Sequence, residues 1–247
     1  MTRFADAGPP GSWLRMMRVA VETGCAGVET LEAAAQGTVK AIYEQFQESM
    51  ILARLFVTIP FGRLPPEIQA AANELAASAA QSTTGDTPVL ALLGTYGDEE
   101  SWRDRRRSRG HVGIPLVSST FISAIPMLAR LLEELGVDIE WFDSADLKTF
   151  VEAGLFKSGS FHVSDATSVV DTQGRKVIAA QEFVLRHGVR TVFGAGAAFL
   201  GTPNMSALIC FTRESLEPEV SQAALTAVSQ FRAMTQGLVN SGKLIGP

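Results

Sequence analysis

Two neighbouring β-prone runs, residues 189–199 and 204–212, constrain the fold of this chain more than any other feature. The short loop between them contains Gly201 and Pro203, and such a loop between two apolar runs is typical of a β-hairpin. Polar and ionisable side chains gather just before the first run, between residues 181 and 190. We therefore expect residues 174–213 to form the central hairpin of a sheet, with polar groups at its entrance.

The composition narrows the class of protein. Of 247 residues, 46% are hydrophobic and 19% are charged, which is ordinary for a globular chain with a sizeable core. The formal net charge of -5 gives no general attraction to nucleic acid or to anionic membranes. No apolar run has the roughly 18–20 residues that span a bilayer, and the first residues lack the apolar core of a signal peptide. These observations predict a cytoplasmic protein with no membrane partner, for which nucleic acid is an unexpected ligand.

The remaining patterns predict helices and strands in a mixed order. Apolar stripes at three- and four-residue spacing predict long helices over residues 28–47 and 220–238, and a third helix begins at Pro65 or Pro66. Pro126 should kink or split a helix over residues 118–135. Two further helical stretches are residues 13–22, which Gly24 interrupts, and residues 179–187; residues 146–152 add one or two helical turns. Additional strands are expected at residues 51–60, 88–94, 112–117 and 161–163. Without an internal repeat or a linker, we divide the chain into an N-terminal extension with a short helix (1–27) and a single domain (28–240).

The strongest charge signal is an arginine cluster formed by Arg103, Arg105, Arg106, Arg107 and Arg109. Arginine binds carboxylate and phosphate groups in a bidentate manner, so the cluster could capture an anionic ligand or nucleic-acid phosphate. The alternative is a solvated, ion-paired segment, since four acidic residues lie within the same stretch. We favour the ion-paired interpretation.

Other chemical motifs are weak. The three histidines, His111, His162 and His187, have no spacing typical of a metal site, and Cys25 and Cys210 are isolated, so no metal site and no redox pair are predicted. The Gly194–Gly196 glycine pair lacks the third glycine of a dinucleotide fingerprint and leads into a strand, which excludes that function. The sequence assigns no cofactor and no catalytic residue.

Several segments together resemble the GAF-like input domains of bacterial signalling proteins. The resemblance rests on LFVTIPFGRLPPEIQ, on GDEESWRDRRRSRGHVGIPL and on the run from FHVSDA through HGVRTVFGAG to ALICFTRE, and it extends over about residues 31–214. It implies an α+β, GAF/PAS-like fold with a mixed, mostly antiparallel central sheet flanked by long N- and C-terminal amphipathic helices. Domains of this type commonly dimerise through their terminal helices. Methionine-sulfoxide reductase activity on this fold requires clustered cysteines, which Cys25 and Cys210 do not provide.

The resemblance implies a sensory or regulatory domain that binds a small molecule against its sheet and signals through its terminal helices to an output protein. We expect a homodimer. The predicted ligand-facing residues are Trp102, Arg106, His111, Gln181, His187 and Arg190, chosen as polar or aromatic groups beside predicted strand ends. Two alternatives remain: an enzyme on a small anionic substrate, with His187 or His111 as general base, and an interaction module that binds nucleic acid or protein through the arginine cluster.

Overall fold

The structure is a computed structural model, and it describes residues 2–8, 10–108, 110–143 and 158–246. Within these residues a sheet of six strands has the order β3-β2-β1-β6-β5-β4, and every neighbouring pair is antiparallel. The strands are β1 Met50–Pro60, β2 Pro88–Gly97, β3 Gly113–Pro115, β4 Gly159–Val163, β5 Thr191–Ala198 and β6 Met205–Thr212. The α-helices are α1 Pro10–Cys25, α2 Leu31–Gln45, α3 Pro66–Ser78, α4 Ser119–Ser123, α5 Pro126–Glu134, α7 Gln181–His187 and α8 Val220–Asn240. The architecture is α+β, as the sequence predicts.

The predicted hairpin is confirmed. Strands β5 and β6 pair from Thr191 opposite Thr212 to Ala198 opposite Met205. Strand β6 also pairs with β1, so these two strands occupy the middle of the sheet and β5 lies one position further out. The hairpin therefore supplies one of the two central strands, and the other is the apolar run that ends at Pro60.

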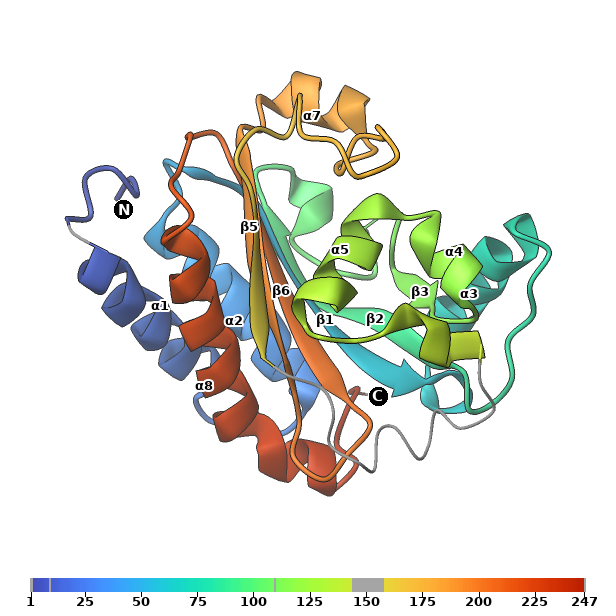
Figure 1. The fold of residues 1–247 in the computed structure, drawn as a ribbon. Helices are drawn as coiled ribbons and strands as arrows, with labels where there is room; N and C mark the ends of the chain where they lie inside the picture. Colours follow the sequence, from blue (N-terminus) through green and yellow to red (C-terminus); the bar gives the residue numbers. More distant parts are fainter. Residues whose placement is uncertain (1, 9, 109, 144–157, 247) are drawn as a thin grey trace.

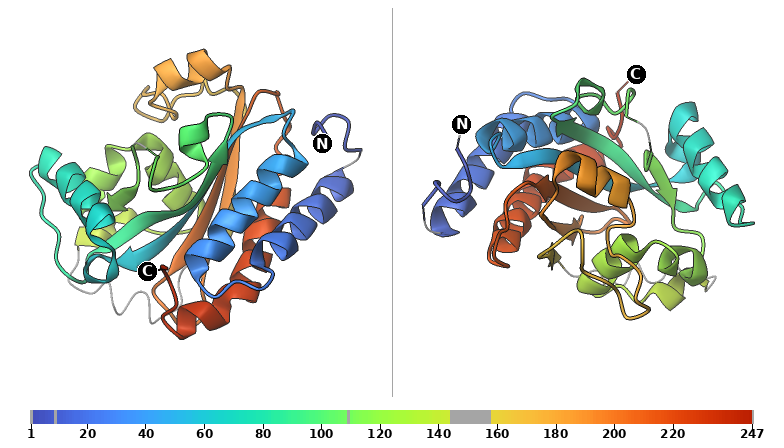
Figure 2. Two further views of the ribbon diagram at one scale, coloured as in Figure 1. Left: turned by 180° about the vertical axis from the view of Figure 1, so that it is seen from behind. Right: turned by 90° about the horizontal axis from the view of Figure 1, so that it is seen from above.

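Helices α2 and α8 cover one face of the sheet, and α1 packs against both of these helices (Figure 1). Their buried residues form one core with the strand residues that point toward them, including Ala53, Leu55 and Val57 of β1. The opposite face is covered by shorter elements, among them α4 and α5, which Figure 2 shows on the far side of the sheet from the long helices. The molecule is thus a three-layer arrangement with the sheet in the middle.

The apolar stripes of α2 and α8 face the sheet of the same chain. Val39 and Ile42 of α2, and Val228 and Phe231 of α8, are almost completely buried in the core. An apolar stripe of this kind can pack on the sheet or pair with the same helix of a second chain, and in this chain both stripes pack on the sheet. A dimer formed through these helices would use their other sides.

Helix α1 is longer than predicted, because it continues through Gly24 to Cys25. Gly24 lies against Gly37 of α2, and a Cβ atom at Gly24 would come within 2.2 Å of the Thr38 backbone nitrogen. This glycine permits close helix packing instead of interrupting the helix. Phe4 and Met17, both from the predicted extension, are also buried in the core under the helices. The division into an N-terminal extension (1–27) and a single domain (28–240) stays a prediction.

Local sequence features set the ends of α2, α4 and α5. The Thr30 side chain accepts a hydrogen bond from the Ala33 backbone N–H and caps α2. Pro126 divides the predicted helix into α4 and α5, and Gly136 ends α5 in the left-handed region with φ of 66°. The helical turns expected at residues 146–152 lie outside the described residues.

Candidate functional site

A cavity of about 270 Å³ lies on the sheet face opposite the long helices. Its floor is formed by side chains from β1, β2, β3 and β6, and its walls come from α5, from residues 177–183 and from the segment that follows β2. The lining is mostly aliphatic and aromatic. The residues are Leu52, Arg54, Phe56, Leu90, Trp102, His111, Ile114, Ile125, Pro126, Met127, Leu128, Leu131, Val177, Ile178, Ala179, Ala180, Phe183, Ile209 and Phe211.

Arg54 brings a positive charge into this apolar cavity. It lies in the middle of the sheet, between Thr95 of β2 and Ile209 of β6. Its Nη2 donates a hydrogen bond to Ser108 Oγ at 3.1 Å, and its buried Nε has no hydrogen-bond partner among the described residues. None of the described acidic side chains forms an ion pair with Arg54. Burial lowers the pKa of Arg54 to about 10, so the guanidinium remains charged at neutral pH.

Two of the predicted ligand-facing residues line the cavity beside Arg54. Trp102 and His111 both come from residues 97–111, a stretch that we call the bridge segment. Burial and the charge of Arg54 lower the pKa of His111, which favours its neutral form. The His111 backbone has φ of 53°, an uncommon conformation for a residue other than glycine, and it follows Gly110 in the same region. The turn at these two residues brings the bridge segment to the edge of the cavity before β3 begins.

Residues 177–183, which we call the roof segment, enclose the cavity with an aromatic contact. The Phe183 ring lies 5.6 Å from the Trp102 ring and 5.5 Å from the Phe211 ring, measured between centroids. Gln181 Nε2 donates hydrogen bonds to the carbonyl oxygens of Ala166 and Ile178, at 2.9 and 2.6 Å. Gln181 thus anchors the roof segment and does not itself line the cavity.

The other predicted ligand-facing residues lie away from the cavity. The His187 ring packs against Trp102 at 4.8 Å, behind the cavity wall. Arg106 is 55% exposed and lies near Glu32 of α2, and Arg190 is exposed beside the Asp165 loop. The structure therefore brings together Trp102 and His111, with His187 behind them, and separates Arg106, Gln181 and Arg190 from the set.

Sequence reasoning missed Arg54. A signal was present, because Arg54 is the one charged residue in the strand MILARLFVTIP. A charge inside an otherwise apolar, buried strand is unusual, since burying it without a partner is costly.

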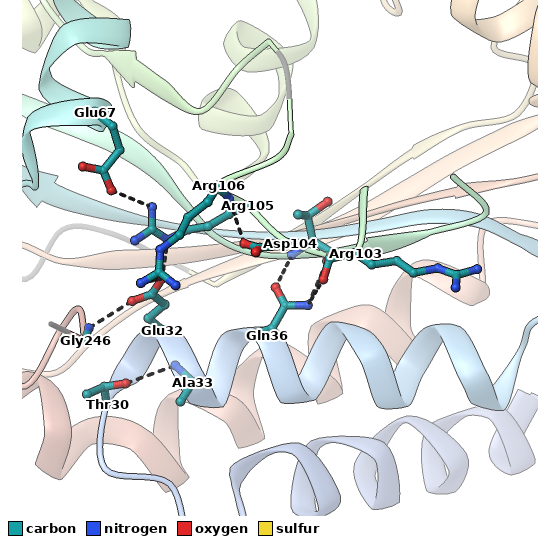
Figure 3. Close-up of polar contacts among 11 residues, drawn as sticks. Thr30, Glu32, Ala33, Gln36, Glu67, Arg103, Asp104, Arg105, Arg106 and Gly246 are labelled. Atoms are coloured by element: carbon teal, nitrogen blue, oxygen red, sulfur yellow. Dashed lines mark hydrogen bonds and ion pairs between the residues drawn. The ribbon is translucent and has the colours of Figure 1, made fainter. Parts of the chain in front are cut away.

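The bridge segment connects the cavity to the helical layer (Figure 3). Arg105 is 3% exposed and donates from Nε to Glu32 of α2 and from Nη1 to Glu67 of α3 at 3.3 Å. Gln36 of α2 donates to the carbonyl oxygens of Thr95 and Arg103 and accepts from the Thr95 backbone N–H. The same segment therefore contacts Arg54 on one sheet face and α2 on the other.

The arginine cluster is largely engaged in contacts within the protein. Arg107 pairs with Glu100 at 2.9 Å, and Arg103 lies over the Tyr96 ring at 5.5 Å. This agrees with the favoured ion-paired interpretation, although the acidic partners of Arg105 come from α2 and α3 instead of from the same stretch. Arg109 lies outside the described residues.

Neither cysteine is at the cavity. Cys210 is buried in the core under the helices, and burial raises its thiol pKa. Cys25 packs against the same core, and its sulfur lies 3.7 Å from Thr38 Oγ1. His162 Nε2 is 2.8 Å from the Leu216 carbonyl oxygen. No group of three or more potential metal ligands occurs in the described parts of the chain. In those same parts, no helix has both the length and the apolar character that crossing a bilayer requires.

Comparison with solved structures identifies the fold. The chain superposes on the GAF domain of a phosphoenolpyruvate-protein phosphotransferase from Coxiella burnetii with a TM-score of 0.51 and 11% identity, over 96% of this chain and 100% of that chain. It superposes on a free methionine-R-sulfoxide reductase from Neisseria meningitidis with a TM-score of 0.50 and 9% identity, over 95% and 93% of the two chains. The superposition on a phycocyanobilin-bound GAF domain from a cyanobacterial phytochrome has a TM-score of 0.47 and 12% identity, over 95% of this chain and 97% of that chain.

Sequence comparison adds no closer relationship, since no protein-family model and no curated protein matches the chain. At these identities the likeness concerns the fold alone. The antiparallel six-stranded sheet, its helical layers and the superposition on the Coxiella burnetii GAF domain together show that the chain has a GAF-like fold.

Proposed function

We propose that this chain is a ligand-binding regulatory domain of the sensory type, which binds a small molecule in the cavity against its sheet. The observation that carries the proposal is the cavity itself, a largely apolar space with two ionisable side chains, Arg54 and His111, converging on it. Small-molecule sites usually have this character, with apolar walls and few polar groups. Trp102 and His111 remain the proposed ligand-facing residues from the sequence, and Arg54 joins them.

The bridge segment supports a route for the signal. A ligand that displaces Trp102 or the Arg54–Ser108 contact would move a segment that is tied to α2 through Arg105 and Gln36. Glu32 in turn accepts from the Gly246 backbone N–H at 2.9 Å, so the residues after α8 belong to the same network (Figure 3). The terminal helices would then present the ligand-dependent change to an output protein or across a homodimer, in the cytoplasm.

Native mass spectrometry of the purified protein tests the binding step, because it reports a retained small molecule and the number of subunits together. Hydrogen exchange tests the signal. We expect the retained molecule, added back to the stripped protein, to slow exchange in residues 97–111 and in the first turns of α2.

Glu32→Gln should remove the response of α2 while binding at the cavity persists. Glu44→Gln is the matched control, because Glu44 lies on the same helix, is 52% exposed and pairs only with Lys40 at 3.8 Å among the described residues. A protein that retains no molecule, and whose exchange no compound in a metabolite collection alters, would contradict the proposal. A ligand response confined to the cavity would contradict the signalling route alone.

A further inference from the structure

The charge of Arg54 has no counterpart in the protein around it. Of the described residues that line the cavity, none is acidic, and the ionisable neighbour His111 is neutral or positive. Ser108 Oγ, a neutral hydroxyl, is the one described acceptor of a hydrogen bond from the Arg54 side chain. Its buried Nε lacks an acceptor altogether among the described residues.

This arrangement is costly unless something else supplies the negative charge. A guanidinium has five N–H donors, and a carboxylate matches their geometry with two oxygens. A donor left unsatisfied in a low-dielectric site loses its interactions with water without replacement. An anionic group bound beside Arg54 would supply both hydrogen-bond acceptors and the opposite charge, whereas a neutral ligand supplies at most an acceptor.

The rest of the cavity restricts what the anion can be attached to. Apart from Arg54 and His111, the lining is aliphatic or aromatic, so additional charges or many hydroxyl groups on the ligand would be buried without partners. Trp102, Phe183 and Phe211 offer aromatic surface to a planar or branched apolar body. The volume of about 270 Å³ is slightly below the roughly 300–1,000 Å³ of drug-sized ligand sites, so the ligand is small.

We infer that the cavity selects a small amphipathic monocarboxylate, with its carboxylate on the Arg54 guanidinium and an aryl or alkyl body against the roof segment. The inference rests on the proposed function, since it names the ligand class of the same cavity. Polyanions such as nucleotides are disfavoured, because a single unpaired arginine faces the cavity among the described residues.

The test uses matched pairs of an acid and its neutral amide: 3-phenylpropanoate with 3-phenylpropanamide, and octanoate with octanamide. Calorimetry and tryptophan fluorescence report binding to the full chain. A charged hydrogen bond contributes enough that the acid of at least one pair should bind roughly 10- to 100-fold more tightly than its amide. Because the site is largely buried, this preference should persist in moderate salt.

Three substitutions test whether Arg54 causes the preference for the acid over the amide. Arg54→Met keeps an unbranched side chain without charge and should abolish discrimination between acid and amide, whereas Arg54→Lys should retain part of it. Arg106→Met is the matched control, because Arg106 is 55% exposed and lies off the cavity, and it should leave both affinities unchanged. Circular dichroism confirms that each variant is folded.

The possible outcomes distinguish failure of the assigned ligand class from failure of the proposed function. Amides that bind wild-type protein as tightly as acids would overturn the assigned ligand class and leave ligand binding intact. An acid preference that survives in Arg54→Met would also overturn it. If neither member of any pair binds and no molecule is retained on purification, the ligand class and the proposed function both fail.

Discussion

The two faces of the sheet differ: one packs against the long helices, and the other forms the floor of the cavity. Strand β1 sends Ala53, Leu55 and Val57 to the helical layer and Leu52, Arg54 and Phe56 to the cavity. Alternation along a strand separates these sets completely, because successive side chains point to opposite faces. The helical face is closed by the long helices α2 and α8, with α1 packed against them, and the cavity face by short helices and loops. The tightly packed helical core and the cavity therefore occupy opposite sides of one sheet, and substitutions should affect them differently.

The largest effect is expected from crowding the helical face. At Gly94 in β2, a Cβ atom would lie 2.5 Å from the Ala35 carbonyl carbon and oxygen of α2, and backbone cannot move aside easily. Gly94→Val should therefore lower the free energy of unfolding by about 3 kcal/mol, measured by urea denaturation. The control Gly237→Ala lies in α8 with open space around it and should raise stability by about 0.5–1 kcal/mol. Equal stability of Gly94→Val and wild type would show that the helical face is not tightly packed.

Removing Arg105 should have the next largest effect. Arg105→Met leaves Glu32, which is 13% exposed, without its closest cation, and we expect a loss of about 2 kcal/mol in the free energy of unfolding. Glu32→Gln in the Arg105→Met background should recover part of the loss, because the unpaired buried carboxylate is then gone. An Arg105→Met protein as stable as wild type would remove the energetic basis for the link between the two faces.

Removing Arg54 should change the free energy of unfolding in the opposite direction from removing Arg105. Without ligand, Arg54→Met removes a buried charge that has no described acidic partner, so the free energy of unfolding should rise by about 1 kcal/mol. The comparison with Arg105→Met, made by denaturation in the same buffer, distinguishes a structural arginine from one kept for a ligand. A loss of stability in ligand-free Arg54→Met would mean that Arg54 supports the fold.

The smallest effect concerns the loop that anchors the roof segment. Hydrogen bonds from Thr167 and Ser168 hold the pKa of Asp165 at about 2, below its ordinary value of 3.8. A lowered carboxyl pKa contributes stability above the unfolded-state pKa, and that contribution disappears as the pH falls from about 4 to 2. Asp165→Asn should therefore show a shallower decline in thermal midpoint over this range than wild type. Parallel declines for the two proteins would contradict the assignment.

The sequence predicted the elements well because their signals are local. The hairpin, the Pro126 break and the α2 stripe each depend on residues that are close in the chain. The residues of the candidate site were harder to predict, because their role depends on which face of the sheet they occupy and on which elements cover that face. Arg105 and Arg106 are adjacent in sequence, yet one is buried between two carboxylates and the other is exposed. Arg54 became a site residue only when the strand register placed it opposite α5 and the roof segment.

The anchoring of the roof segment bears on how long a ligand stays. Gln181 fastens this segment to the Ala166 carbonyl, and the α7 helix, which begins within the segment, has only seven residues. Opening of the roof segment would separate the Phe183 ring from Trp102 and Phe211, while the sheet beneath remains intact. Residence time would then be governed by the opening of the roof segment, and affinity by Arg54 and the floor. Under the proposed function, substitutions in the roof segment would change the dissociation rate of the ligand without changing which molecule binds.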